Sequence, residues 1–390
     1  MPDASAMFGE KTTCVHRAWV VTDGAALERN LGKIKAALPP HVRYMAVVKA
    51  DAYGHGALHT VTRLLQSGVD CFCVANGREG AEVRELGPGS EILVLGPLLP
   101  EEMPTLAAYD LTASISTREE MLALSVLAGQ YGRRIPVHVK VDTGMGRMGT
   151  WYEDAPDFIG AVLGQPSLEL RGIYTHFSSA GMDAPFTSLQ RQRFVGALSA
   201  LPGSLRKSSH FLIHADNSAG LETFASEGPF NAVRVGLLQY GLPPHRGSLL
   251  KRLKPEAVLS FHSRVGLVKN LPRGTSVSYD RTHTLARDTR VAIVTAGYGD
   301  GIPVSASNKA QVLIHGQRCP VLGRVTMDQT VVDASDLAHV AVGDTVTLIG
   351  KQGCDEISVS EFCAWAGMIP WDVFCSITKR VERVPTGLRG

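Results

Sequence analysis

The sequence predicts an α/β barrel plus a mainly β domain, that is, an N-terminal (β/α)8 TIM-like barrel followed by a C-terminal β-strand domain. From residue 43 to about 241, short apolar, β-rich runs alternate with helical stretches. After Pro255 this rhythm changes to strands separated by turns. At 390 residues the chain also exceeds a typical single core, so two domains are expected.

Eight strand-like runs form the repeating part. They span residues 43–50, 71–76, 91–96, 111–116, 136–142, 168–177, 211–216 and 232–240. The runs lack clear polar–apolar alternation and are separated by helices such as 58–67, 78–86 and 118–129, which predicts a parallel sheet covered on both faces. Thr117 and Glu120 give the last of these helices a capping box. Eight such units fit a closed barrel, and an open doubly wound sheet is the alternative.

The rest of the chain predicts the second domain. Runs 258–271, 289–298, 311–333 and 344–349 have strand character, with hardly a helix until 358–367. We expect the barrel to occupy residues 16–250 and the β domain residues 251–390, joined by the connector 240–255. The early strand-like run 16–22 is compatible with either domain.

The composition excludes several functional classes. The 39 basic and 37 acidic side chains nearly cancel, which argues against nucleic-acid or membrane-surface binding. No apolar run approaches the roughly 18 residues needed to span a bilayer. Residues 1–14 lack the features of a signal peptide, and seven cysteines, Cys14 among them, show no disulfide or metal-ligand spacing. A soluble cytoplasmic protein with reduced thiols and no metal site is expected.

Polar side chains recur where the predicted barrel strands end, the rim on which such barrels carry their chemistry. Lys49 ends the first run and His176 the sixth. The same rim receives Asn76, Arg147, Asn217, Ser218, Arg234, Gly236 and Tyr240. A lone histidine or arginine at a strand end is usually structural, but this shared location favours a functional site.

Lys49 suggests the chemistry of this rim. A lysine in a shielded pocket can lose its proton and attack a carbonyl to form a Schiff base, and pyridoxal phosphate is the common aldehyde partner. Barrels tend to hold phosphate after strands seven and eight, where Ser218 and Gly236 would suit it. Tyr53 offers a further hydroxyl or packs in the core, and spacing leaves both readings open.

Six motifs, in order, resemble the alanine racemase family of fold-type III pyridoxal-phosphate enzymes, and the likeness spans residues 19–384. They are AVVKADAYGHG (46–56), KVDTGMGRMG (140–149), NAVRVGLLQYG (231–241), SVSYDRTHT (276–284), TAGYGDG (295–301) and GRVTMDQ (323–329). One such motif is weak support, whereas six in the right order are strong.

The resemblance implies a role for each matched residue. Lys49 would bind pyridoxal 5′-phosphate and act as one acid/base, and Tyr279, from the other protomer of a homodimer, as the second. The implied cofactor-binding residues are Lys49, Tyr53, His176, Asn217, Ser218, Arg234, Gly236 and Trp371, with Arg234 at the pyridine nitrogen. The implied substrate-binding residues are Arg147, Tyr298, Met327 and Asp328. Lys140 matches a lysine that is carbamylated in some members.

The implied reaction is the interconversion of L-alanine and D-alanine, which supplies D-alanine for peptidoglycan. Two bases on opposite faces, Lys49 and Tyr279, would move the Cα proton without rotating the substrate. An arginine at the ring nitrogen should leave that nitrogen unprotonated, because a guanidinium does not surrender its proton. Side reactions such as transamination are then suppressed.

Two positions depart from the family pattern. Trp371 stands where the family usually has a tyrosine that reaches the cofactor phosphate, and Thr326 stands where many members have cysteine. The tryptophan is either a neutral replacement or, together with Thr326, a change that favours a side activity on serine.

Two other functions are compatible with parts of the sequence. A fold-type III decarboxylase should carry a glycine-triplet phosphate loop and a carboxylate at the ring nitrogen, but the chain has no Gly-Gly-Gly and offers Arg234. A pyridoxal-phosphate carrier of the single-barrel type should end after the barrel, whereas this chain continues through a β domain bearing Tyr279.

Overall fold

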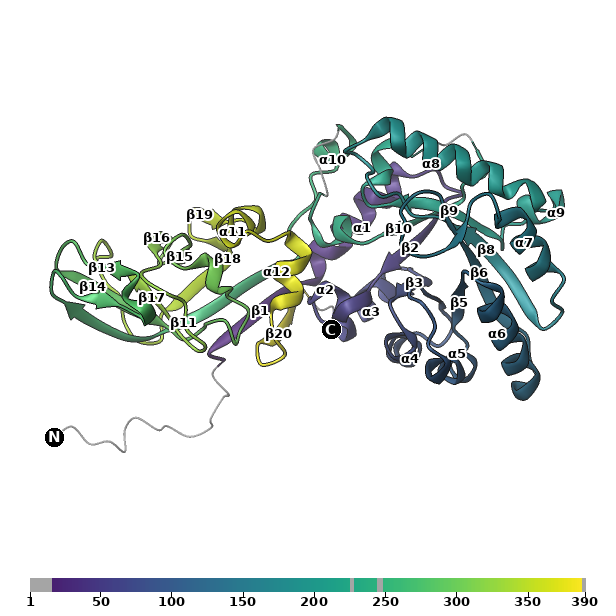
Figure 1. The fold of residues 1–390 in the computed structure, drawn as a ribbon. Helices are drawn as coiled ribbons and strands as arrows, with labels where there is room; N and C mark the ends of the chain where they lie inside the picture. The colour runs from purple at the N-terminus through teal and green to yellow at the C-terminus, as the bar shows by residue number, and fades with distance from the viewer. Residues whose placement is uncertain (1–15, 225–227, 244–247, 388–390) are drawn as a thin grey trace. The chain divides into compact units, whose positions relative to one another are not determined.

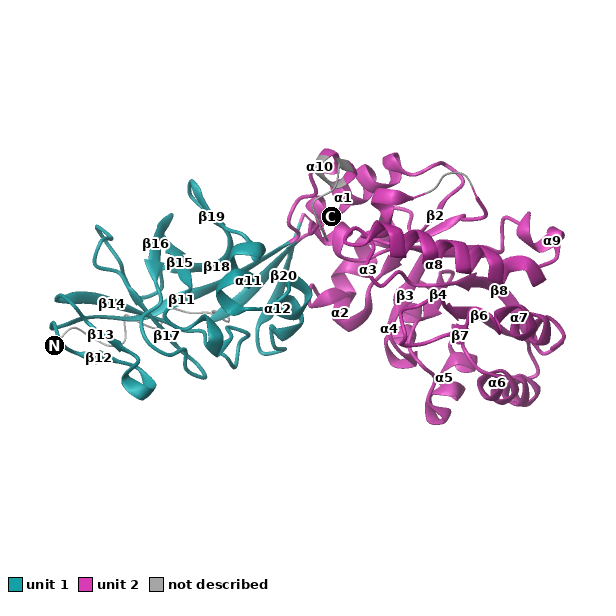
Figure 2. Cartoon of the chain, turned by 45° about the horizontal axis from the view of Figure 1, so that its top comes forward, with its two compact units in different colours: residues 1–22, 259–386 teal, residues 23–258, 387–390 magenta. Residues whose placement is uncertain are grey.

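The computed structural model describes residues 16–224, 228–243 and 248–387, and the chain divides into two compact units (Figure 2). One unit comprises residues 23–258 with 387–390, and the other residues 1–22 with 259–386. Cys14, positions 244–247 of the expected connector and the last three residues of the expected β domain lie outside the described residues.

A closed barrel of eight parallel strands forms the centre of the unit that begins at residue 23 (unit 2 in Figure 2; Figure 1). Its strands pair in the order β2-β3-β4-β5-β6-β8-β9-β10, and β10 pairs with β2 to close the ring. The strands are β2 (Arg43–Val47), β3 (Cys71–Val74), β4 (Glu91–Val94), β5 (Thr112–Ile115), β6 (Ile135–Asp142), β8 (Leu168–Tyr174), β9 (Leu212–Asn217) and β10 (Ala232–Val235). The predicted TIM-like barrel is therefore confirmed, and the open sheet is excluded.

Helices cover the outside of this barrel (Figure 1). They are α1 (Gly24–Ala37), α3 (Ala57–Gln66), α4 (Gly77–Leu86), α5 (Met103–Ala108), α6 (Arg118–Tyr131), α7 (Ala155–Leu163), α8 (Ala184–Ala197), α9 (Gly203–Arg206) and α10 (Ser248–Leu253). The predicted capping box is present, since Thr117 accepts from the Glu120 backbone and Glu120 accepts from the Thr117 backbone. A two-residue strand, β7 (Thr150–Trp151), extends the sheet beside β6.

Two predicted strands end earlier than expected. The run 43–50 leaves the sheet after Val47, and Lys49 begins the short helical segment α2 (Lys49–Tyr53). The run 232–240 ends at Val235, and Tyr240 lies in the 3-10 helix η5 (Leu237–Tyr240). In both places the chain turns over the rim of the barrel after the last paired residue. The residues of the turn include apolar ones, so the predicted strand ran on past the observed one.

The other unit (unit 1 in Figure 2) is built mainly from antiparallel strands. They are β1 (Ala18–Asp23), β11 (Leu259–Leu271), β12 (Ser276–Val277), β13 (His283–Thr284), β14 (Thr289–Val294), β15 (Gln311–Ile314), β16 (Gln317–Pro320), β17 (Thr330–Asp333), β18 (Thr345–Gln352), β19 (Asp355–Ile357) and β20 (Glu382–Thr386). The early strand β1 pairs with β11, from Ala18 opposite Ser263 to Thr22 opposite Leu259. The sequence pattern anticipated the helix α11 (Val359–Ala366) but missed α12 (Pro370–Ser376).

None of the helices in the described part of the chain combines the length and the apolar character needed to cross a lipid bilayer.

Candidate active site

Lys49 opens a left-handed turn at the end of β2. The next four residues all have positive φ: 52° at Ala50, 53° at Asp51 and Ala52, and 55° at Tyr53. Each L-residue in this conformation costs roughly 1–2 kcal/mol, because Cβ approaches the following carbonyl oxygen. Consecutive non-glycine residues of this kind persist only where surrounding structure holds them, and such strain is typical of functional sites.

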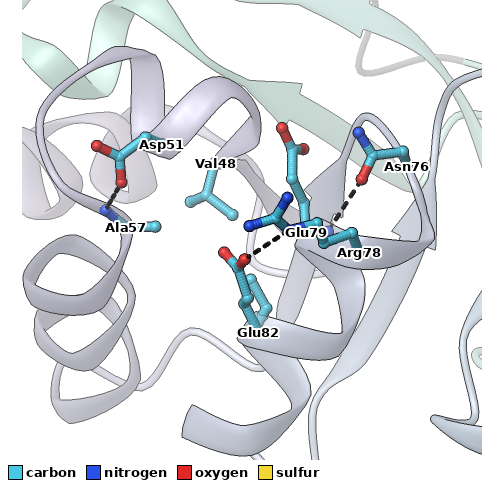
Figure 3. Close-up of a pocket in the computed structure, with 8 residues that line it drawn as sticks. Val48, Asp51, Ala57, Asn76, Arg78, Glu79 and Glu82 are labelled. Atoms are coloured by element: carbon cyan, nitrogen blue, oxygen red, sulfur yellow. Dashed lines mark hydrogen bonds and ion pairs between the residues drawn. The ribbon is translucent and has the colours of Figure 1, made fainter. Parts of the chain in front are cut away.

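Side chains from α4 and from the turn itself hold this conformation, and Figure 3 shows one of these contacts, from Asp51 to the backbone of Ala57. The Glu79 carboxylate accepts from the backbone N–H of Ala50 at 2.9 Å and from that of Ala75 at 2.7 Å. Asp51 accepts from Ala57 N at 2.6 Å, beside a hollow of 280 Å³. Glu79 therefore ties the lysine-bearing turn to the neighbouring strand end.

Asn76 has a structural role on this rim. It is the N-cap of α4, and its side chain accepts from the Glu79 backbone at 3.0 Å. Sequence reasoning did not single out Glu79. The pattern Asn76-Gly-Arg-Glu79, an N-cap residue followed three positions later by glutamate, is the signal that could have found it.

Ser218, Gly236 and Tyr53 form a polar cradle at the ends of β9 and β10. Ser218 Oγ accepts from the backbone N–H of Gly236 at 2.9 Å. A Cβ added at Gly236 would lie 2.7 Å from the Tyr53 hydroxyl. Asn217 turns the chain here, because its Oδ1 accepts from the N–H groups of Ala219 and Gly220. The cradle presents two hydroxyls and backbone around a position that only glycine leaves open.

Arg234 lies buried on β10, surrounded by acceptors. Its Nη2 donates to the carbonyls of Thr175 at 2.8 Å and Ala215 at 3.0 Å, and its Nη1 to His214 Nδ1 at 2.6 Å. Burial lowers its pKa from the ordinary value, although a guanidinium remains charged in any accessible pH range. These bonds fix the position of the guanidinium.

His176 lies between two groups that present N–H donors. Its Nδ1 is 3.2 Å from Arg234 Nη2, and its Nε2 is 3.3 Å from Asn217 Nδ2. Because an imidazolium has no acceptor, only the neutral ring can accept a hydrogen bond from either neighbour. Burial, followed by the charge of Arg234, lowers the His176 pKa well below its usual value.

A cluster of cations surrounds Lys140, which is buried on β6. Burial, then the charges of Arg234, Arg147 and Lys49, lower the Lys140 pKa to about 7, and only Asp142 opposes them. Arg147 lies exposed in the loop between β6 and β7. Four basic side chains at one end of the barrel favour an anionic ligand.

The remaining predicted site residues belong to the other unit, where most are exposed. Tyr279 is 68% exposed in a strained turn, with positive φ at Ser278, Asp280 and Arg281. Met327 is 52%, Tyr298 43% and Trp371 39% exposed. Trp371 lies in the first turn of α12.

Two loops of this unit hold three of these residues side by side. Tyr298 N donates to Thr326 O at 2.9 Å, and Gly299 N donates to Met327 O at 2.8 Å. Arg380 fastens the pair, because it donates to Asp328 at 2.8 Å and to the buried Asp300 at 2.8 Å. Arg380 and Asp300 were not expected from the sequence.

The predicted residues thus form two groups. The first group lies at or beside the ends of the barrel strands and comprises Lys49, Tyr53, Lys140, Arg147, His176, Asn217, Ser218, Arg234 and Gly236. Tyr279, Tyr298, Met327, Asp328 and Trp371 lie in the β unit.

Comparisons with known proteins single out one family. The chain matches the profile of the alanine racemase N-terminal domain over residues 22–244 and that of the C-terminal domain over residues 258–385. The alanine racemase of Halothermothrix orenii is 37% identical over 366 residues, which cover 94% of this chain and 96% of that protein. The solved alanine racemase of Clostridium difficile 630 superposes with a TM-score of 0.89 at 29% identity, covering 96% of this chain and 97% of that one. The structure from Bacillus anthracis, with bound L-Ala-P, gives a TM-score of 0.85 at 31% identity and covers 97% of each chain.

Proposed function

Since the chain belongs to the alanine racemase family, whose members are isomerases, we propose that it interconverts L-alanine and D-alanine with pyridoxal 5′-phosphate as cofactor. One observation carries this proposal. A lysine on a strained turn, a hydroxyl-lined cradle and a buried arginine meet at one end of the barrel.

The residues present fit the cofactor. The phosphate would lie in the cradle of Ser218, Gly236 and Tyr53, where a Cβ at Gly236 would intrude. Arg234 would face the pyridine nitrogen, and the neutral His176 ring and Asn217 would flank the cofactor. When bound, the cofactor would withdraw electrons from Cα of the amino acid and so make its hydrogen acidic.

The side chains supply the proton transfers. Lys49 would bind the cofactor aldehyde and take or return the Cα proton on one face, and Tyr279 would do the same on the other. Arg234 cannot donate its proton outright, so the ring nitrogen would stay unprotonated and transamination would be suppressed. A decarboxylase would be expected to carry a carboxylate at this position.

Arg147 would bind the substrate carboxylate, and Lys140 would orient Arg147. A lysine with a pKa of about 7 has a large neutral fraction at neutral pH, and a neutral amine can react with carbon dioxide. The carbamate so formed would place a negative charge among Lys49, Arg147 and Arg234. We propose that this carboxylate orients Arg147.

A second copy of the chain would complete the site. The exposure of Tyr279, Tyr298, Met327 and Trp371 is consistent with a partner barrel that covers them. In this head-to-tail homodimer each β unit would supply Tyr279 as a base, Tyr298, Met327 and Asp328 around the substrate, and Trp371 beside the phosphate.

The proposed cellular role is the supply of D-alanine for peptidoglycan from the cytoplasm. Cys71, Cys73 and Cys319 are buried free thiols, as expected of a protein in a reducing compartment.

The direct test gives the purified protein L-alanine or L-serine, with and without added pyridoxal phosphate, and measures the D-isomers. D-alanine that forms only with the cofactor supports the proposal, and no D-isomer from either substrate overturns it. Faster turnover of serine would instead assign a serine preference to Thr326 and Trp371.

A further inference from the structure

The inside of the barrel holds both apolar and polar side chains. Because successive strand residues point to opposite faces, alternate positions share the interior. The interior apolar cluster comprises Met45, Val47, Cys71, Cys73, Leu93, Leu212 and Ala232. Glu91 on β4, His214 on β9 and Arg234 on β10 each lie two positions along their strand from a member of this cluster. His138 on β6, His214 and Arg234 are buried, and Glu91 is partly exposed. Polar groups inside a barrel are costly unless they bond to one another.

These four residues form one chain of contacts across the interior. Arg234 Nη1 is 2.6 Å from His214 Nδ1, and His214 Nε2 is 3.0 Å from His138 Nδ1. His138 Nε2 is 3.7 Å from Glu91 Oε1. Glu91 Oε2 accepts from Arg43 at 2.7 Å, near the opposite end of β2 from Lys49.

The arginine sets the direction of every bond in this chain. A guanidinium has donors only, so Nδ1 of His214 must be the acceptor. The neutral His214 ring then carries its hydrogen on Nε2 and donates to His138 Nδ1. His138 in turn carries its hydrogen on Nε2, which makes no hydrogen bond within the described residues and faces Glu91 as its nearest charged acceptor.

The charges at the two ends suit this arrangement. Burial, then the charge of Arg234, lower the His214 pKa well below its usual value, so the ring is neutral. Burial alone would raise the Glu91 pKa, but His138 and Arg43 outweigh it and lower the pKa, so the carboxylate is ionised. The ionised Glu91 carboxylate therefore faces Nε2 of His138, the last donor of the chain.

We propose that Glu91 and His138 are positioning residues for Arg234: they further stabilise the His214 tautomer that accepts from the guanidinium, and so help to hold the guanidinium in place at the rim. The proposal rests on the proposed function only in assigning Arg234 to the pyridine nitrogen of the cofactor. Without the carboxylate of Glu91, only the His214 donor would favour a hydrogen on Nε2 of His138. A hydrogen on Nδ1 would oppose the His214 donor and release Arg234.

The packing around His138 leaves it little freedom. A Cβ added at Gly172 would lie 2.6 Å from the Leu212 carbonyl oxygen, 2.7 Å from His138 Cε1 and 2.8 Å from His138 Nε2. Tyr174 stacks on His214 at 4.8 Å between ring centroids, with 7° between the planes. Gly172→Ala would therefore strain the pairing of β8 with β9 as well as displace His138.

Nitrogen NMR of ¹⁵N-histidine protein tests the proposal, since it distinguishes a protonated ring nitrogen from an unprotonated one. The spectra are recorded on the full-length protein with and without pyridoxal phosphate, and His138→Gln and His214→Gln assign the signals. We expect both rings to be neutral with hydrogen on Nε2. Because this readout needs no turnover, it tests the bond chain whether or not the protein proves to be a racemase.

Glu91→Leu should move the hydrogen of at least one of these histidines to Nδ1. The substitution should lower kcat for alanine roughly ten- to hundred-fold and leave KM nearly unchanged. Losses of this size are typical when a residue that orients a functional histidine is removed. Asp70→Asn is the matched control, because Asp70 also contacts Arg43, at 3.3 Å, but lies outside the chain of bonds. A wild-type hydrogen on Nδ1 of either ring, or unaltered tautomers and kcat in Glu91→Leu, would overturn the proposal.

Discussion

Gly236 has no room for a side chain, because Tyr53 occupies the adjacent space. A Cβ at Gly236 would lie 2.7 Å from the Tyr53 hydroxyl, whereas ordinary contacts begin at 3.4 Å, so the hydroxyl must retreat by the difference, 0.7 Å. Tyr53 ends a left-handed turn that Glu79 and Asp51 hold, so it cannot move alone. A misplacement near 1 Å in a positioned site costs roughly 100-fold. We therefore expect Gly236→Ala to weaken pyridoxal phosphate binding ten- to hundred-fold, or about 1.4–2.8 kcal/mol.

Titration of the cofactor-free protein with pyridoxal phosphate, followed by absorbance, measures this loss. Gly32→Ala is the matched control, because nothing lies within 4 Å of its added Cβ. It lies in α1, where alanine favours the helix by roughly 0.5–1 kcal/mol, and should bind the cofactor normally. Tyr53→Phe removes the nearest clashing atom, so Gly236→Ala should cost less affinity in that background. Wild-type affinity in Gly236→Ala would refute the cradle.

Three further predictions concern the bases, the buried lysine and the assembly. Tyr279→Phe should retain cofactor binding, and its racemisation rate should fall at least 100-fold. It should still exchange the Cα hydrogen of one enantiomer with deuterated water. An undiminished racemisation rate would contradict the two-base mechanism. The Lys140 pKa of about 7 lies below the roughly 10.4 of an unfolded lysine, so the fold loses stability as pH falls through that interval. In protein freed of the carbamate, Lys140→Met should therefore stabilise the fold more at pH 7 than at pH 10 in urea denaturation. Equal gains at the two pH values would argue against a buried lysine with a lowered pKa. Specific activity should fall on dilution as the dimer dissociates, and a fully active monomer in sedimentation would exclude the shared site.

The barrel could be predicted because its strands are buried on both faces. Such strands appear as continuous apolar runs between helices, and each of the eight expected runs overlaps an observed strand. The family resemblance drawn from six motifs is also confirmed. The backbone conformation at the rim, where two expected strands end early, was not predicted. Ala50 to Tyr53 adopt positive φ because Glu79 and Asp51 hold them, and no local propensity signals such a turn.

The bond chain inside the barrel could not be predicted for a different reason. Glu91, His138 and His214 are separated by 47 and 76 residues in sequence, and each alone resembles a structural polar residue at a strand. Only closure of the barrel brings them together. The helix α12, which carries Trp371, was missed because seven residues beginning with proline give too short a period to recognise.

Reduction of the purified protein with borohydride, followed by peptide mass mapping, tests the central claim most directly. The account predicts a visible absorbance band that disappears on reduction and a phosphopyridoxyl mass on the peptide that contains Lys49. A protein with no such band after incubation with pyridoxal phosphate, or a mass on another lysine such as Lys140, would contradict it.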